Sequence, residues 1–296
     1  FSYSEPEFLL STMDRHQDWA VIICLIGGGQ EINPGEAGLP EWFDSLRRQF
    51  LDWDVYITPN LNDEEYRRSN EWKDLIMGLN VYEVEKLHLS TSVRSFRTPD
   101  LADLIKAILD VNINKAKVLY DRCKFKYPII ITREIAKAKA WIRTQCQGTT
   151  RYGLLASSGA LRLKPEGIFV KNDISVENWF LNEKNDVRSS YYLEDVVTEF
   201  DIQGLELDYS IVAWDADLRF ENNEWNYYNF SGKRWNNVNS INKRIYLKNS
   251  YRVLLTRARQ GMVIFIPKEE NDDNTRETKY YDGIYNYLKA IGIDEI

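Results

Sequence analysis

Histidine and cysteine are scarce in this sequence. Its 296 residues include only two histidines and three cysteines, and the cysteines stand far apart at Cys24, Cys123 and Cys146. A structural zinc site needs four clustered ligands, and a disulfide scaffold needs a dense, even set of cysteines. The pattern argues against both. Unpaired thiols suit a reducing compartment, so we expect a cytoplasmic protein.

Long hydrophobic runs are also missing. No apolar stretch approaches the roughly 20 residues of a membrane span, and the start of the chain lacks the charged and apolar regions of a secretory signal. We therefore expect no membrane partner. The chain begins at Phe1 rather than at a methionine, and we interpret it as part of a longer protein or as a processed product.

An overall positive charge is absent, because the formal net charge is −7. One stretch departs from this balance. Between Lys115 and Arg143 there are nine basic residues against Asp121 and Glu134. A local excess of this kind is typical of a surface that follows a phosphate backbone. It is equally typical of a solvated helix face, and the sequence leaves both interpretations open.

What the sequence does contain is a series of short, continuous apolar segments that alternate with helical patterns. The clearest are Ala20–Ile26, Pro128–Thr132, Tyr152–Ala156, Ser210–Trp214 and Met262–Ile266. Continuous apolar runs are typical of strands buried on both faces of a parallel sheet. The pattern predicts a three-layer α/β/α sandwich with a mostly parallel sheet. It also predicts helices over 40–52, 64–78 and 101–108, and Ser4 as the cap of the first helix.

Four polar segments follow or adjoin these predicted strands. They are Gly28-Gly29-Gln30, Leu89–Arg97 with Arg94 and Arg97, Thr198–Asp208 with Gly204 and Glu206, and Tyr251–Gln260 with Arg257 and Arg259. Ligands of open α/β sheets bind at the carboxyl ends of the strands. We expect Gln30, Arg94 and Arg257 to converge on one solvent-accessible face at such an edge.

At this point the sequence resembles a known family. Thr198–Asp208 is similar to motif V of superfamily 1 helicases, and Leu254–Arg259 is similar to motif VI, the "LTRA" helix with its arginine finger. Gly28–Gln30 and Leu89–Arg97 match motifs III and IV. Tyr152–Gly159 and Asp186–Ser190, with the order of all these segments, resemble the Schlafen-type (group 3) DNA/RNA helicase domain over nearly the whole chain.

The resemblance implies an ATP site between two RecA-like domains. It implies that Gly29 and Gln30 face the γ-phosphate, that Arg94 and Arg257 are catalytic, and that Gly204 and Glu206 couple nucleotide to nucleic acid. By the same resemblance, residues 1–82 are the remnant of a first RecA-like domain. Residues 83–296 are then the second such domain, with an irregular insertion or loop at about 217–242.

One departure from the family pattern limits the expected activity. A phosphate-binding loop has the pattern G-x-x-x-x-G-K-[S/T], and these 296 residues do not contain it. The Asp-Glu pair that holds Mg²⁺ does not precede Gly28 either. We expect ATP and Mg²⁺ to serve the complete protein and neither to bind tightly to this chain alone. The expected partners are single-stranded or duplex nucleic acid and a first RecA-like domain.

Other interpretations of the same residues stay open. Gly204 can be a simple turn glycine, and Arg94 and Arg257 can be ion-pair partners on the surface. A non-catalytic domain that binds nucleic acid or protein is one alternative function. A metal-dependent nuclease is a less favoured one, because Glu206 and Asp208 are not followed by the lysine that such sites use.

Overall fold

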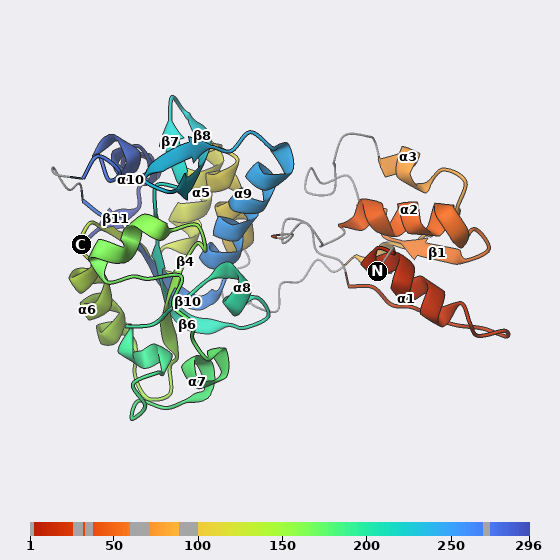
Figure 1. Cartoon of the computed structure of the whole chain (residues 1–296), viewed down its shortest axis with the longest axis horizontal. Helices are drawn as coiled ribbons and strands as arrows, with labels where there is room; N and C mark the ends of the chain where they lie inside the picture. Colours follow the sequence, from red (N-terminus) through yellow and green to blue (C-terminus); the bar gives the residue numbers. More distant parts are fainter. Residues whose placement is uncertain (1–2, 26–31, 33–37, 60–71, 89–99, 269–272) are drawn as a thin grey trace. The chain divides into compact units, whose positions relative to one another are not determined.

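The computed structural model describes residues 3–25, 32, 38–59, 72–88, 100–268 and 273–296 (Figure 1). The chain divides into two compact units, Phe1–Thr91 and Ser92–Ile296. Gly29, Gln30 and Arg94, to which the sequence assigns roles in the site, lie outside the described residues.

The first unit is a small α/β assembly. Its elements are α1 (Glu5–Met13), α2 (Leu39–Gln49), β1 (Asp54–Ile57), α3 (Trp72–Ile76), β2 (Asn80–Glu83) and the short 3-10 helix η2 (Glu85–Leu87). β1 and β2 pair in parallel. The buried residues Leu10, Phe43, Leu46, Phe50 and Ile57 form its core, so α1 and α2 pack on one face of this two-stranded sheet. The helix predicted over 40–52 is confirmed.

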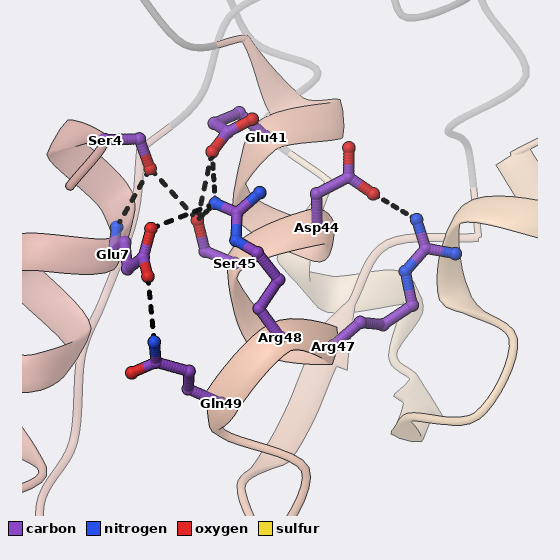
Figure 2. A network of polar contacts seen from close by, with 8 residues as sticks. All are labelled: Ser4, Glu7, Glu41, Asp44, Ser45, Arg47, Arg48 and Gln49. Atoms are coloured by element: carbon purple, nitrogen blue, oxygen red, sulfur yellow. Dashed lines mark hydrogen bonds and ion pairs between the residues drawn. The ribbon is translucent and has the colours of Figure 1, made fainter. Parts of the chain in front are cut away.

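A polar network joins α1 to α2 (Figure 2). Ser4 caps α1 as predicted, because its hydroxyl accepts from the Glu7 amide at 3.4 Å. The Ser4 hydroxyl also lies 3.2 Å from that of Ser45. Glu7 turns toward α2, where its carboxylate accepts from Arg48 and from Gln49, each at 3.2 Å. The ion pair between the Glu7 carboxylate and the Arg48 guanidinium therefore holds α1 against α2.

The strand predicted over Ala20–Ile26 is wrong for the residues that are described. Residues 20–25 form no strand, and Val21, Ile23 and Leu25 are 64%, 83% and 80% exposed. An apolar run forms a buried strand only where neighbouring strands can accept its hydrogen bonds. In the described part of this unit, β1 and β2 pair with each other and not with this segment.

The second unit is built on a six-stranded sheet of order β11-β3-β10-β6-β4-β5, in which all pairs are parallel. Its strands are β3 (Ile129–Thr132), β4 (Tyr152–Ala156), β5 (Val196–Val197), β6 (Leu207–Ala213), β10 (Ala258–Phe265) and β11 (Asp294–Glu295). Its helices are α4 (Leu101–Leu109), α5 (Ile113–Cys123), α6 (Ile135–Gln145), α7 (Val176–Leu181), α8 (Glu199–Ile202), α9 (Ile241–Leu255) and α10 (Lys279–Ile291). The 3-10 helices η3 (Leu161–Glu166) and η4 (Ser190–Tyr192) complete it. The predicted α/β fold with a parallel sheet is confirmed.

Side chains alternate in direction along the central strands, so that successive residues pack on opposite faces of the sheet. Ile211 and Ala213 of β6 and Phe265 of β10 pack with Ala138 and Ile142 of α6 in one buried cluster. Figure 1 shows α6 on one side of the sheet and α5 and α9 on the other. Residues between those of the cluster, such as Val212, are also fully buried. The continuous apolar runs therefore reflect burial on both faces, as the sequence pattern predicts.

The segment 217–242, predicted as an irregular insertion or loop, contains an antiparallel sheet of three strands. These are β7 (Leu218–Glu221), β8 (Glu224–Ser231) and β9 (Arg234–Asn237). Asn222 and Asn223 both have positive φ, as the two-residue turn of a β-hairpin requires. The prediction took the high Asn, Trp and Tyr content of this segment as the mark of a loop, although Leu218-Arg219-Phe220-Glu221 alternates apolar and polar residues as a half-buried strand does.

The three-stranded sheet is held against α10 and α4. Phe220 stacks on Tyr287 with a centroid distance of 4.1 Å, and the Trp225 indole donates to the Leu109 carbonyl at 2.8 Å. Gly283 of α10 lies so close to β7 that an added Cβ would sit 1.8 Å from the Phe220 carbonyl oxygen. A glycine at this position therefore lets helix and strand approach each other.

Candidate functional site

Two of the predicted motifs meet at the start of β6 and β10. Gly204 has a φ of +88°, a backbone conformation that glycine adopts without strain, and it lies within the short segment 203–206 between α8 and β6. Arg257 follows α9 and directly precedes β10. Leu207 pairs with Ala258, and the Leu207 amide donates to the Arg257 carbonyl at 3.0 Å. The turn of Gly204 and the backbone of Arg257 are therefore neighbours.

These motifs lie at the amino ends of the strands. The sequence analysis expected the carboxyl ends, and for these two motifs that expectation is wrong. Gly204 and Glu206 precede β6, and Arg257 precedes β10. Since β6 and β10 run in parallel, the residues before both strands gather at one edge. The rule for carboxyl ends applies to segments that follow a strand, whereas the Gly204 and Arg257 segments lead into one.

Arg257 itself is enclosed by protein rather than open to solvent. Its side chain is 1% exposed, and its Nε donates to the Val253 carbonyl at 3.2 Å, one turn back along α9. The expected solvent-accessible position of this side chain is therefore wrong. Burial fixes the direction in which the guanidinium points. The guanidinium of an exposed, flexible arginine would have no such fixed direction.

Arg259, by contrast, is a surface ion-pair partner. Its Nη2 lies 3.1 Å from Oδ1 of Asp208, and its side chain is 47% exposed. The same carboxylate accepts from Gln260 at 2.9 Å and from the Arg151 amide at 2.8 Å. Asp208 thus joins the starts of β6, β10 and β4. Glu206 is half-buried beside them.

A second polar cluster, which the sequence analysis missed, lies at the opposite edge. Oδ2 of Asp217, after β6, accepts from the Ser157 hydroxyl at 2.7 Å. Its Oδ1 accepts from the hydroxyl of Tyr251 at 2.5 Å. Glu199, after β5, accepts from the amide and hydroxyl of Ser158, both at 2.8 Å. The segments after β4, β5 and β6 are therefore tied together by buried carboxylates.

Burial raises the pKa of two aspartates at this edge, Asp215 and Asp217. It is the main cause that raises the pKa of Asp217 to about 7, and the neighbouring Asp215 raises it further. Burial likewise raises the pKa of Asp215, whose carboxylate accepts from the Tyr281 hydroxyl at 2.9 Å. The sequence signal for this cluster was the Ser-Ser-Gly segment after β4 together with Asp215-x-Asp217 after β6. Only the parallel order of the strands brings the two together.

Neither edge provides a metal centre within the described part of the chain. No group of three histidine, cysteine, aspartate or glutamate side chains there could hold a metal ion. Asp208, one of the two carboxylates considered for a nuclease, is taken up by Arg259, Gln260 and the Arg151 amide. The geometry therefore lends the nuclease interpretation no support.

Comparison with known proteins identifies the family. Residues 1–268 match the family described as Schlafen group 3, DNA/RNA helicase domain. The chain belongs to this family, which supports a role related to nucleic-acid helicases. Neither the curated proteins nor the solved structures gave a match. No helix among the described residues has the length and apolar character to cross a membrane.

Proposed function

We propose that this chain provides the second RecA-like domain of an ATP-dependent helicase or translocase. In this proposal Arg257 is the arginine finger, and Gly204 and Glu206 couple the nucleotide to nucleic acid. The observation that carries the proposal is the pairing of Leu207 with Ala258, which places the Gly204 turn beside Arg257 at one edge of the sheet. Membership of the family supports a role related to nucleic-acid helicases, and the roles of the individual residues rest on the motif resemblance and on this pairing.

The chemistry of phosphoryl transfer explains why a positioned arginine belongs at such an edge. The reaction depends mainly on alignment and on neutralising charge that develops on the transferred group, and an arginine finger contributes roughly 10³–10⁵ in rate. A guanidinium acts best when its direction is fixed in advance. The bond from Nε of Arg257 to the Val253 carbonyl provides that fixation. Because the side chain is 1% exposed, the proposal also requires that binding of the first domain open a path from the phosphate to the guanidinium.

The proposal assigns matching roles to Gln30 and Arg94, as sensor of the γ-phosphate and as second catalytic arginine. Two guanidiniums repel each other by about 4 kcal/mol at 4 Å in a surface-like dielectric. A phosphate between Arg94 and Arg257 would remove this repulsion. The phosphate and Mg²⁺ would be held by the phosphate loop of a first domain, since the 296 residues contain no such loop.

The test joins this chain to a phosphate-loop domain of the same family and measures nucleic-acid-stimulated ATP turnover. Arg257→Lys keeps the charge but loses the planar fork, and we expect it to lower kcat about 10³-fold or more. Arg259→Lys is the matched control two residues away, where the ion pair with Asp208 is at the surface, and its kcat should stay within about twofold. Equal turnover of Arg257→Lys and the parent, at equal thermal stability, would refute the arginine-finger role.

A non-catalytic binding domain is the second candidate, favoured by the missing phosphate loop. The two candidates differ in one measurement. The helicase proposal requires that the joined protein hydrolyse ATP and that nucleic acid stimulate the rate. A binding domain would retain nucleic acid with the same affinity whether or not ATP is present, and its turnover would not depend on Arg257.

A further inference from the structure

The structure separates the basic stretch Lys115–Arg143 into two groups with different surroundings. The later group is neutralised within the protein. Arg133 lies 2.7 Å from Asp282, Lys137 3.5 Å from Glu134, and Lys139 3.1 Å from Glu194. Arg143 donates to the Tyr192 carbonyl at 3.2 Å. These residues form the solvated, ion-paired helix face that was one of the two interpretations.

The earlier group, on α5 and the turn that follows it, is neutralised only in part, since Lys115 lies 3.9 Å from Asp103 and Lys124 lies 2.6 Å from Asp121. Lys117, Arg122 and Lys126 are exposed. Among the described residues, no carboxylate forms an ion pair with any of the three. Arg122 stands three and four residues before Phe125 and Lys126, the spacing at which side chains are neighbours on a helical turn. Lys117 lies about 140° away from Arg122 around the helix, at 3.6 residues per turn, and belongs to another side of α5.

An aromatic side chain stands in the middle of this surface. Phe125 is 88% exposed, which is the highest exposure among the large hydrophobic residues of the described chain. Lys124 and Lys126 flank it in the sequence, and the Lys124 ammonium lies 5.6 Å from its ring centroid. An exposed phenylalanine that contacts little protein gives no stability to the fold. Its ring face is available to a flat partner.

The turn is anchored next to the candidate site. Tyr127, two residues after Phe125, is fully buried, and its hydroxyl donates to the Ala258 carbonyl at 3.1 Å. Ala258 directly follows Arg257. The Pro128 carbonyl accepts from the Met262 amide at 2.9 Å, further along the same strand. A rigid contact therefore links the exposed turn to the strand that begins at Arg257.

We propose that Arg122, Phe125 and Lys126 form a binding surface for single-stranded nucleic acid, in which the cations contact phosphates and Phe125 stacks on an unpaired base. Basic side chains that follow a backbone, combined with an aromatic platform, are the features by which proteins hold single strands without reading sequence. A duplex offers its phosphates but no free base to Phe125. The inference rests on the proposed function for its choice of partner.

Binding is measured with the 296-residue chain by fluorescence anisotropy, using fluorescein-labelled dT20, rU20 and a 20-base-pair duplex. We expect both single strands to bind more tightly than the duplex. Phe125→Ala should weaken single-strand binding roughly 5- to 100-fold, as the loss of one stacked base does. Phe125→Tyr, which keeps the ring, should restore it. Duplex affinity should change less than twofold in both variants.

The charges are tested by salt dependence. Each phosphate contact with a single strand contributes about 0.7 to the slope of log K against log salt. The double variant Arg122→Ala, Lys126→Ala should reduce this slope by about 1.4. The matched control Lys139→Ala, Lys268→Ala removes the same charge from ion-paired positions, and we expect it to keep most of the slope.

Several outcomes would overturn the inference. These are no binding of either single strand by the parent chain, equal effects of the two double variants, or an unchanged affinity in Phe125→Ala. A duplex bound as tightly as the single strands, or an acidic peptide bound in place of nucleic acid, would also overturn it. None of these results alters the turnover of Arg257→Lys, so the surface and the arginine finger can fail independently.

Discussion

Replacing Asp217 by asparagine tests the account of the buried carboxylates. The side chain is 1% exposed, and burial with the neighbouring Asp215 raises its pKa to about 7. An ordinary aspartate has a pKa near 3.9. Because the folded value lies above the unfolded one, Asp217 stabilises the fold at low pH and loses this contribution as pH rises from about 4 to about 7.

The size of the effect follows from the same shift. Between the two pKa values the free energy of unfolding falls by about 1.4 kcal/mol for each pH unit. From pH 5 to pH 8 the loss due to Asp217 is therefore about 2–3 kcal/mol. Small domains have a total stability of only about 5–15 kcal/mol, so the change should be easy to measure.

Asparagine is a near-isosteric test of this titration. Its amide oxygen can accept from Tyr251, and its amide group can donate to the Ser157 hydroxyl, which stands 2.7 Å from Asp217. We expect the stability of Asp217→Asn relative to the parent to increase by about 2–3 kcal/mol between pH 5 and pH 8. The exposed Asp173→Asn serves as control and should leave the pH dependence unchanged.

The assay is urea unfolding followed by circular dichroism at pH 5, 6, 7 and 8. Differences between variants then report on the second unit, whatever the first unit contributes. If the stabilities of the parent and of Asp217→Asn run parallel over this range, within about 0.5 kcal/mol, the reasoning about buried charge is refuted.

Two other predictions concern packing and activity. Gly283→Ala should lower the free energy of unfolding of the second unit by more than about 2 kcal/mol. The added Cβ would lie 1.8 Å from the Phe220 carbonyl oxygen, and overpacking of a tight contact is costly. At an ordinary helix position the same substitution would stabilise the helix. Asn286→Ala on the exposed face of α10 is the control in the same urea assay, and a stable Gly283→Ala variant would contradict the packing. The isolated 296-residue chain should hydrolyse ATP at a rate far below about 1 s⁻¹, the low end of ordinary enzyme rates, since it has no phosphate loop. A turnover of about 1 s⁻¹ that disappears in Arg257→Ala would contradict this expectation.

The central strands could be predicted from the sequence because their burial on both faces leaves a direct record in it. β4 was predicted with its bounds, Tyr152–Ala156, and β3, β6 and β10 were predicted in position. The apolar run at Ala20–Ile26 shows where this reasoning stops. Composition indicates that a segment can be buried, but the neighbouring strands decide whether it is.

The candidate site was less accessible to sequence reasoning. Motif resemblance selected Gly204 and Arg257, and their adjacency depends on the pairing of β6 with β10, which no local pattern encodes. The carboxylates of Glu199 and Asp217 come from segments after different strands. Their shared burial results from strand order, and so do the raised pKa of Asp217 and its bonds to Ser157 and Tyr251.

The exposed segment around Ile23 has a practical consequence for handling the protein. Val-Ile-Ile-Cys-Leu combines high β-propensity with no charge and no proline, which is the signature of a segment prone to self-association into β-aggregates. Three of its large side chains are more than half exposed. A charged residue in place of Ile23 would act as a gatekeeper against such aggregation. Because this segment forms no strand among the described residues, the gain in colloidal stability should come at little cost to the fold.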